Sequence, residues 1–259
     1  AGELGQLIKI PVYKTARVTD SFVFPEWDPV EHTGGVFPLI VNRKLILESD
    51  LNANAKGFRG AVPYAEYNGV CSNISSGSYQ AKSYLEAHSD SSGLKGEGLV
   101  KDGYTYTRGY GRLANAGGGG NGKFSGGGGG SNEGQGGRGG KESTSCSDPG
   151  DLGGTGGQSL TSYYTNNSGE FAYNRIFMGG GGGSGTQTTA RSSSSGGNGG
   201  GIIILIVDTL DGNGYSISAD GGSVSGIVDG AGAGGGGGGV IVLDVSTYEG
   251  DLSLSVKGG

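Results

Sequence analysis

Three carboxylates and a tryptophan lie close together in the segment PEWDPVEH. Glu26, Asp28 and Glu31 are the acidic residues, and Trp27 stands between the first two. Paired carboxylates hydrolyse glycosidic bonds in many enzymes, and β-solenoids often carry such pairs on a strand face. The same residues also fit an acidic loop with one partly buried tryptophan. We favour this second interpretation.

Aromatic residues elsewhere keep a carbohydrate site open as an alternative. Tyr104 and Tyr106 alternate in the segment GYTYTR. A groove lined by these two residues, Trp27 and acidic side chains would indicate a carbohydrate-binding or carbohydrate-active β-solenoid.

Other motifs that could bind a ligand or catalyse a reaction are incomplete. The segment GGGGNGKF, residues 117–124, matches a phosphate-binding loop until Phe124 replaces the Ser or Thr that binds magnesium. Both histidines, His32 and His88, lie in polar sequence without an adjacent nucleophile motif. The turn aspartates of the C-terminal half follow no calcium-binding repeat. We therefore expect no catalytic residue, no cofactor and no metal site, and a protein that is not an enzyme.

The two cysteines, Cys71 and Cys146, lie in polar, loop-like sequence. A single disulfide between them is the preferred interpretation, and two unpaired loop thiols are the alternative. Neither cysteine belongs to a CxxC pair, and only two histidines accompany them, so the spacing does not favour a zinc site.

Composition and charge exclude several classes of protein. The chain has 259 residues, 62 of them glycine, and a formal net charge of −6. Its 18 Lys and Arg residues form no cluster, so we do not expect nucleic acid as a partner. The longest apolar run, residues 202–207, is far shorter than the ~20 residues of a membrane helix, so we expect no transmembrane segment.

A strand, turn, strand, glycine pattern repeats near the end of the chain. Residues 201–222 align with residues 239–259 if one residue is inserted in the first copy, and residues 48–57 resemble part of the second copy. Recurring strand pairs with long excursions predict an all-β fold of stacked pairs, either a β-solenoid or a β-sandwich. We expect residues 1–259 to be one module, with an N-terminal β part (1–110) that carries loop insertions and a glycine-rich part (111–259).

Apolar residues stand at the ends of the glycine runs. Phe124 precedes residues 126–130, Met178 precedes residues 179–183, and residues 234–239 lead into a strand. Polyglycine can form an extended threefold helix, and several such helices can pack closely because they lack side chains. We therefore expect the glycine-rich excursions to be packed as polyglycine helices rather than to be slack linkers.

The order of these motifs resembles a known family. The motifs are NAKGFRG, SSGLKGEG, LANAGGGGNGKFSGGGGGSNEGQGGRGG, NRIFMGGGGGSG, GGNGGGIIILIVDTLDGNG and GAGAGGGGGGVIVLDVSTYEGDLSLSVKGG. Together they resemble the glycine-rich module of gliding-motility-associated, type IX-secreted surface adhesins of Bacteroidetes, over residues 33–259. The resemblance implies export by the type IX secretion system and a role in adhesion or in extended fibres. It supplies no catalytic residues.

We therefore expect an extracellular, non-enzymatic structural module at the bacterial outer cell surface, which supports attachment or gliding. Its expected partners are surface glycans or other cell-surface proteins, and we expect it to be a fragment, a processed subunit or one module of a longer adhesin. Besides the carbohydrate alternative, a second alternative is a fibre subunit that associates with itself. In that case the exposed strands LIKIPVY and LSLSV would pair between copies.

Overall fold

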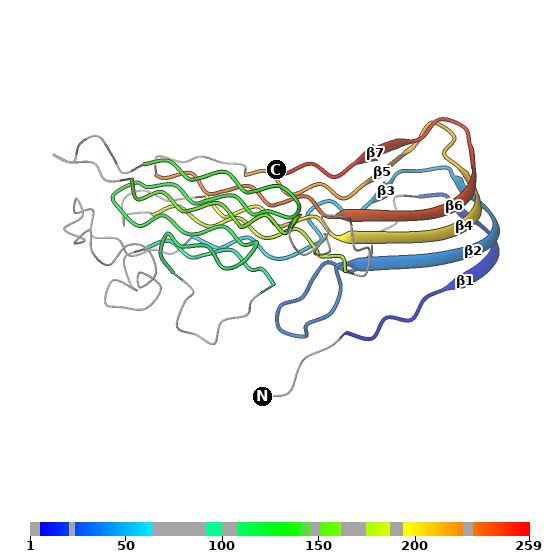
Figure 1. The fold of residues 1–259 in the computed structure, drawn as a ribbon, viewed down its shortest axis with the longest axis horizontal. Coiled ribbons are helices and arrows are strands. Elements are labelled where there is room, and N and C mark those ends of the chain that lie inside the picture. The colour runs from blue at the N-terminus through cyan, green and yellow to red at the C-terminus, as the bar shows by residue number, and fades with distance from the viewer. Residues whose placement is uncertain are drawn as a thin grey trace.

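The computed structural model describes residues 6–20, 24–63, 92–99, 108–141, 143, 145, 151–161, 175–186, 194–224 and 230–259. The strands lie at one end of an elongated molecule, and the glycine-rich segments fill the other end (Figure 1). In these residue ranges we find no helix with the length and hydrophobicity needed to cross a bilayer.

The described residues contain two parallel sheets. One has the strand order β1-β2-β4-β6 and the other has the order β3-β5-β7. The bounds are β1 (Val12–Val18), β2 (Val36–Leu47), β3 (Leu51–Asn52), β4 (Ile202–Asp211), β5 (Ser216–Ser218), β6 (Val240–Glu249) and β7 (Ser253–Ser255). Every hydrogen-bonded neighbour in both sheets runs parallel.

The expected fold class, stacked strand pairs in a β-solenoid or a β-sandwich, is wrong. It treats a strand and its successor, such as β4 and β5, as one pair. In the structure these two strands lie in different sheets, and each pairs with the corresponding strand of another repeat copy. Corresponding strands run in the same direction, so the neighbours are parallel. A hydrophobic pattern shows which face a strand buries, but it does not show which strand supplies the hydrogen bonds.

The strand registers give the true alignment of the repeats. In the two C-terminal copies, Asp211 pairs with Glu249 and Ile217 pairs with Leu254, so one extra residue lies between the strands of the first copy, as expected. The earlier copy is displaced by two residues, because Leu51 pairs with Ile217 rather than with the equivalent of Leu252. A shift of two residues keeps side chains on the same face of a strand, and Leu51 is still fully buried.

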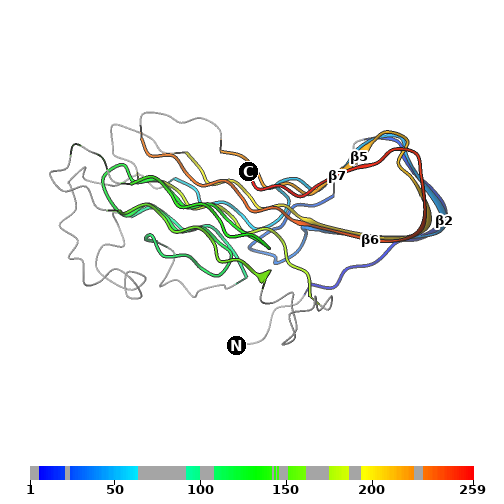
Figure 2. The ribbon, with the colours of Figure 1, turned by 45° about the horizontal axis from the view of Figure 1, so that its top comes forward.

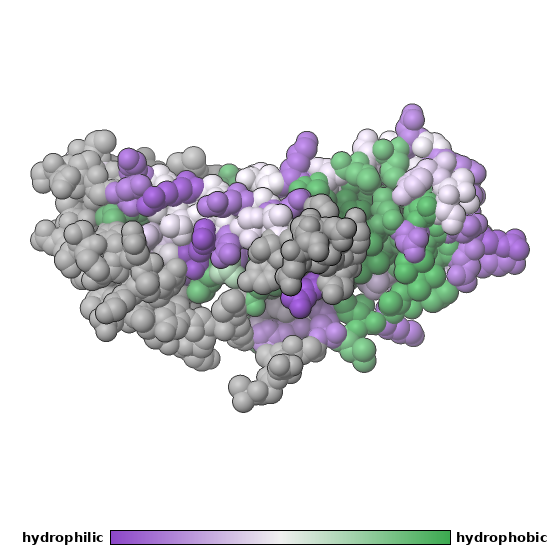
Figure 3. Space-filling view, viewed as in Figure 1, coloured by the Kyte–Doolittle hydropathy of each residue, from purple (hydrophilic) through white to green (hydrophobic). Residues whose placement is uncertain are grey.

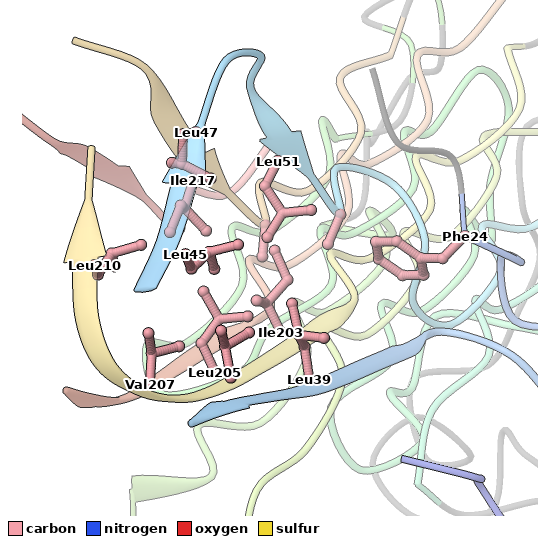
Figure 4. Packing of buried hydrophobic residues seen from close by; sticks show 13 residues of the cluster. Phe24, Leu39, Leu45, Leu47, Leu51, Ile203, Leu205, Val207, Leu210 and Ile217 are labelled. Carbon is pink, nitrogen blue, oxygen red and sulfur yellow. The ribbon is translucent and has the colours of Figure 1, made fainter. Parts of the chain in front are cut away.

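A hydrophobic core fills the space between the two sheets. Figure 4 shows the side chains of β2 and β4 pointing toward those of β3 and β5. The fully buried residues include Leu45, Leu47, Leu51, Ile203, Leu205, Leu210 and Ile217. Figure 2 shows the strands of each sheet lying behind one another, so each repeat copy forms one arch around this core.

Truncation of a central core residue is expected to destabilise the protein far more than the same change at an end strand. Leu205→Ala removes a side chain with no exposed surface, and we expect a loss of about 3 kcal/mol in the free energy of unfolding. The matched control is Leu254→Ala, since this side chain is 55% exposed; its expected cost is below about 1 kcal/mol. Denaturant unfolding of both variants measures the difference, and equal losses would contradict this placement of the core.

Candidate functional site

The extended glycine-rich segments pack side by side, and we call this array the glycine bundle. One segment lies inside the bundle and is hydrogen-bonded on all sides. We call residues 178–186 the central segment, and every one of them is buried. Its backbone N–H groups donate to three different segments in turn, with donor–acceptor distances of 2.8–3.0 Å. The donor–acceptor pairs are Gly179 to Gly200, Gly180 to Ser131, Gly181 to Glu97, Gly182 to Gly197, Gly183 to Gly128, Ser184 to Leu94 and Thr186 to Ser125.

The carbonyl groups of the central segment bond to three further segments. The pairs, from donor to acceptor, are Phe58 to Gly179, Ala61 to Gly182, Gly237 to Gly180, Gly234 to Gly183, Gly117 to Gly181 and Gly120 to Ser184. The neighbour therefore repeats at every third residue on both the donor and the acceptor side. This periodicity is that of an extended threefold helix without internal hydrogen bonds. Six neighbours surround the central segment and satisfy its buried backbone groups.

The close packing excludes side chains at the glycines of the central segment. A Cβ atom on Gly181 would overlap the carbonyl oxygen of Arg59, and one on Gly183 would overlap that of Gly118. A backbone oxygen in a packed array cannot move aside as the end of a flexible side chain can. Glycine is therefore required here by the close approach of neighbouring backbones.

Buried asparagines complete the hydrogen bonding where the bundle meets the sheets. Asn115 has no exposed surface; its Nδ2 donates to the carbonyls of Ser131 and Met178, and its Oδ1 accepts from the N–H of Leu99 at 2.9 Å. Nδ2 of Asn132 lies 3.0 Å from both the Phe177 and the Gly238 carbonyl oxygens. These amides bond to backbone groups at the sheet-facing end of the central segment.

A small apolar cluster joins the bundle to the sheets. Phe58, Met178 and Ile202 are its buried members, and Trp27 packs against them. The Trp27 ring meets Phe58 edge to face at a centroid distance of 5.7 Å, and its Nε1–H donates to Glu97 Oε1 at 2.9 Å.

The structure thus places Trp27, one of the three residues considered for carbohydrate contact, at this junction. Tyr104 and Tyr106 lie outside the described residues, as do both cysteines, Cys71 and Cys146. The aromatic groove and the disulfide therefore stay predictions.

The acidic residues around Trp27 make local structural contacts. Glu26 pairs with Arg59 at 3.0 Å. Asp28 accepts hydrogen bonds from the backbone N–H groups of Glu31 and Val30, and these bonds hold the pKa of the Asp28 carboxyl below its usual value. Within the described residues, no group of three His, Cys, Asp or Glu side chains is placed to hold a metal ion.

The segment that resembles a phosphate-binding loop is part of the bundle. The N–H groups of Gly117, Gly118 and Gly120 donate to carbonyls of Gly181, Thr155 and Ser184. A phosphate-binding loop needs such N–H groups free to bond the phosphate. Since these three N–H groups already donate to backbone carbonyls, they do not form a phosphate site.

The packing of Gly181 can be tested with two alanine variants. We expect Gly181→Ala to lower the free energy of unfolding by more than about 2 kcal/mol, because the new Cβ overlaps backbone. Gly140→Ala is the matched control: no atom lies within 4 Å of the Cβ position, so the change is expected to be neutral or to stabilise by up to about 1 kcal/mol. Equal effects of the two changes on denaturant unfolding would show that the central segment is not tightly packed.

The role of the buried amide is tested by Asn115→Ala. The variant leaves the Leu99 N–H and two carbonyls without their side-chain partner, and we expect it to lose about 1–3 kcal/mol of stability. Amide hydrogen exchange should rise first at Leu99. An unchanged exchange rate there would mean that the Asn115 side chain does not hold this end of the bundle.

Comparisons with known proteins found no relative of this chain. No protein-family model matches the chain, and neither a curated protein nor a solved structure shows significant similarity to it. The likeness to glycine-rich modules of gliding-motility-associated adhesins therefore stays a hypothesis that depends on the sequence motifs.

Proposed function

We propose that this chain is an extracellular, non-enzymatic structural module of a bacterial surface adhesin, in which the glycine bundle is a stiff arm that carries attachment loops. The observation that supports the proposal best is the central segment with its six hydrogen-bonded neighbours. These neighbours come from parts of the chain that are far apart in sequence, so backbone hydrogen bonds join distant parts of the chain along the central segment. This network of hydrogen bonds favours a bundle that acts as a rigid spacer.

The two ends of the bundle differ in what they carry. The sheet-facing end contains Met178 and Asn132, whereas the opposite end, which we call the distal end, contains Thr186 and Ser125. The register of the hydrogen bonds also directs Pro63 and Ser92 toward the distal end, because Ala61 bonds to Gly182 and Gly93 bonds to Gly120. Residues 64–91 are therefore flanked by chain that lies toward the distal end.

In this proposal the distal end binds surface glycans or other cell-surface proteins. The sequence likeness to type IX-secreted adhesins supports an outer-surface location. Side chains at the distal end are consistent with a contact surface: Val62 is 62% exposed, and the ammonium of the partly exposed Lys123 lies 6.0 Å from the centre of the Phe124 ring.

The proposal predicts that binding depends on residues 64–91. We expect purified protein on beads to adhere to bacterial or host surfaces, and we expect adhesion to fall at least about tenfold when residues 64–91 are replaced by an eight-residue Gly/Ser linker. The matched control replaces residues 162–174 in the same way. This segment is flanked by Leu160, whose N–H donates to Asn132 at the sheet-facing end, so the control should keep its adhesion.

Both replacements are made in a parent chain with Cys71→Ser and Cys146→Ser, so that neither variant differs in thiol content. Thermal unfolding checks that each variant folds. Equal adhesion of the two variants would contradict a distal binding surface. Turnover of a glycan by the parent chain would contradict the non-enzymatic proposal.

A further inference from the structure

Among the residues that the structure describes, both sheets are open at their last strands. β6 and β7 are end strands, and between them lies a groove of about 730 Å³ lined in part by Ile241, Leu243 and Leu254. Leu254 is 55% exposed although its neighbour in register, Ile217, has no exposed surface. Figure 2 looks toward this open arch, and Figure 3 shows hydrophobic residues gathered on the sheet end of the molecule.

The opposite end of the first sheet is open in the same way. β1 is its end strand, and a groove of about 650 Å³ beside it is lined in part by Tyr13, Ala16 and Leu39. Val12 and Tyr13 are 57% and 52% exposed. Among the described residues, no strand pairs with the outer side of β1.

The two open ends carry opposite charge. Residues 6–18, which contain β1, have three basic side chains, those of Lys9, Lys14 and Arg17, and no acidic one. Residues 240–252, which contain β6, have three acidic side chains, those of Asp244, Glu249 and Asp251, and no basic one. Two β1 ends would therefore repel each other, as would two β6 ends, whereas a β1 end and a β6 end would attract.

The sheet register shows which residues such a contact would bring together. Along the sheet, Tyr13 is in line with Val245, Ala16 with Tyr248, and Arg17 with Glu249. If another β1 were added beyond β6 in the same parallel register, the small Ala16 would lie beside the large Tyr248. Arg17 would lie beside Glu249.

We propose that copies of this chain stack head to tail, with β1 of one copy pairing in parallel with β6 of the next in this register. The inference goes beyond the proposed adhesive function, since it concerns how modules assemble. A contact between two different surfaces of the same chain leaves one of each surface free, so copies add one after another and form an open fibre unless the stack closes on itself as a ring. Backbone hydrogen bonds would extend the sheet, and charge would select the partner edge.

The side chains around the contact already form ion pairs within one copy. Arg17 pairs with Glu48, and Lys44 pairs with Glu249 at 2.6 Å and with Asp211 at 2.9 Å. These side chains are partly exposed, and the added Arg17 would place a cation beyond the adjacent carboxylates of Asp211 and Glu249. Arg17 therefore faces two carboxylates in the stack, those of Glu249 and Glu48.

Sedimentation and electron microscopy of the full chain test the proposal. We expect wild-type protein at low ionic strength to form fibres above a critical concentration, and added salt to raise that concentration. Arg17→Glu alone should raise it at least about tenfold, because the introduced carboxylate would meet that of Glu249, and Glu249→Arg alone should do the same. The matched control is Lys141→Glu, an exposed charge reversal away from both sheet ends, which should assemble as wild type does.

A mixture of the two single variants provides the decisive measurement. Each contact between unlike copies then joins opposite charges, so the equimolar mixture should assemble although neither variant does so alone. Wild-type protein that stays monomeric at all concentrations overturns the proposal. So does a mixture that stays monomeric while both variants show the wild-type melting temperature, or single variants that assemble as wild type does.

Discussion

The structure depends on one constraint: buried peptide groups in the glycine bundle must bond to neighbouring segments, because an extended threefold helix has no hydrogen bonds of its own. A single glycine run would face an ordering cost of about 1–2 kcal/mol per residue without compensation. Six neighbours around residues 178–186 satisfy donors and acceptors together. The neighbouring backbones can approach this closely only where residues lack side chains. The high glycine content follows from this requirement.

The same chain segments form both the bundle and the sheets, so each part fixes the arrangement of the other. Residues 194–201 lead into β4, and residues 230–239 lead into β6. Their hydrogen bonds cross between layers, since Gly201 N–H donates to the Ala53 carbonyl and Gly239 N–H donates to the Ala219 carbonyl. Segments that leave the bundle in the same direction continue as parallel strands. The parallel pairing of the strands therefore follows from the path of the chain through both the bundle and the sheets.

The sequence predicted the position of the repeats better than the way they pair. The segment YSISA alternates apolar and polar residues, and its Ile217 is buried in the core; the inserted residue of that copy is visible in the alignment. The same alternation in β7 could not show that Leu254 is half exposed, because exposure there depends on the absence of a further neighbouring strand among the described residues. Trp27 was interpreted from its acidic neighbours, whereas its contacts with Phe58 and Glu97 come from distant parts of the chain.

The two ends of the molecule bury different kinds of surface, and this has a thermal consequence. The sheet end buries leucine and isoleucine, whose exposure on unfolding raises the heat capacity. The bundle buries mainly peptide groups, whose exposure lowers it. The stability of the bundle should therefore vary less steeply with temperature than that of a leucine-rich core of equal size. On cooling, the bundle should therefore lose less stability than a core that depends on the hydrophobic contribution, which weakens in the cold.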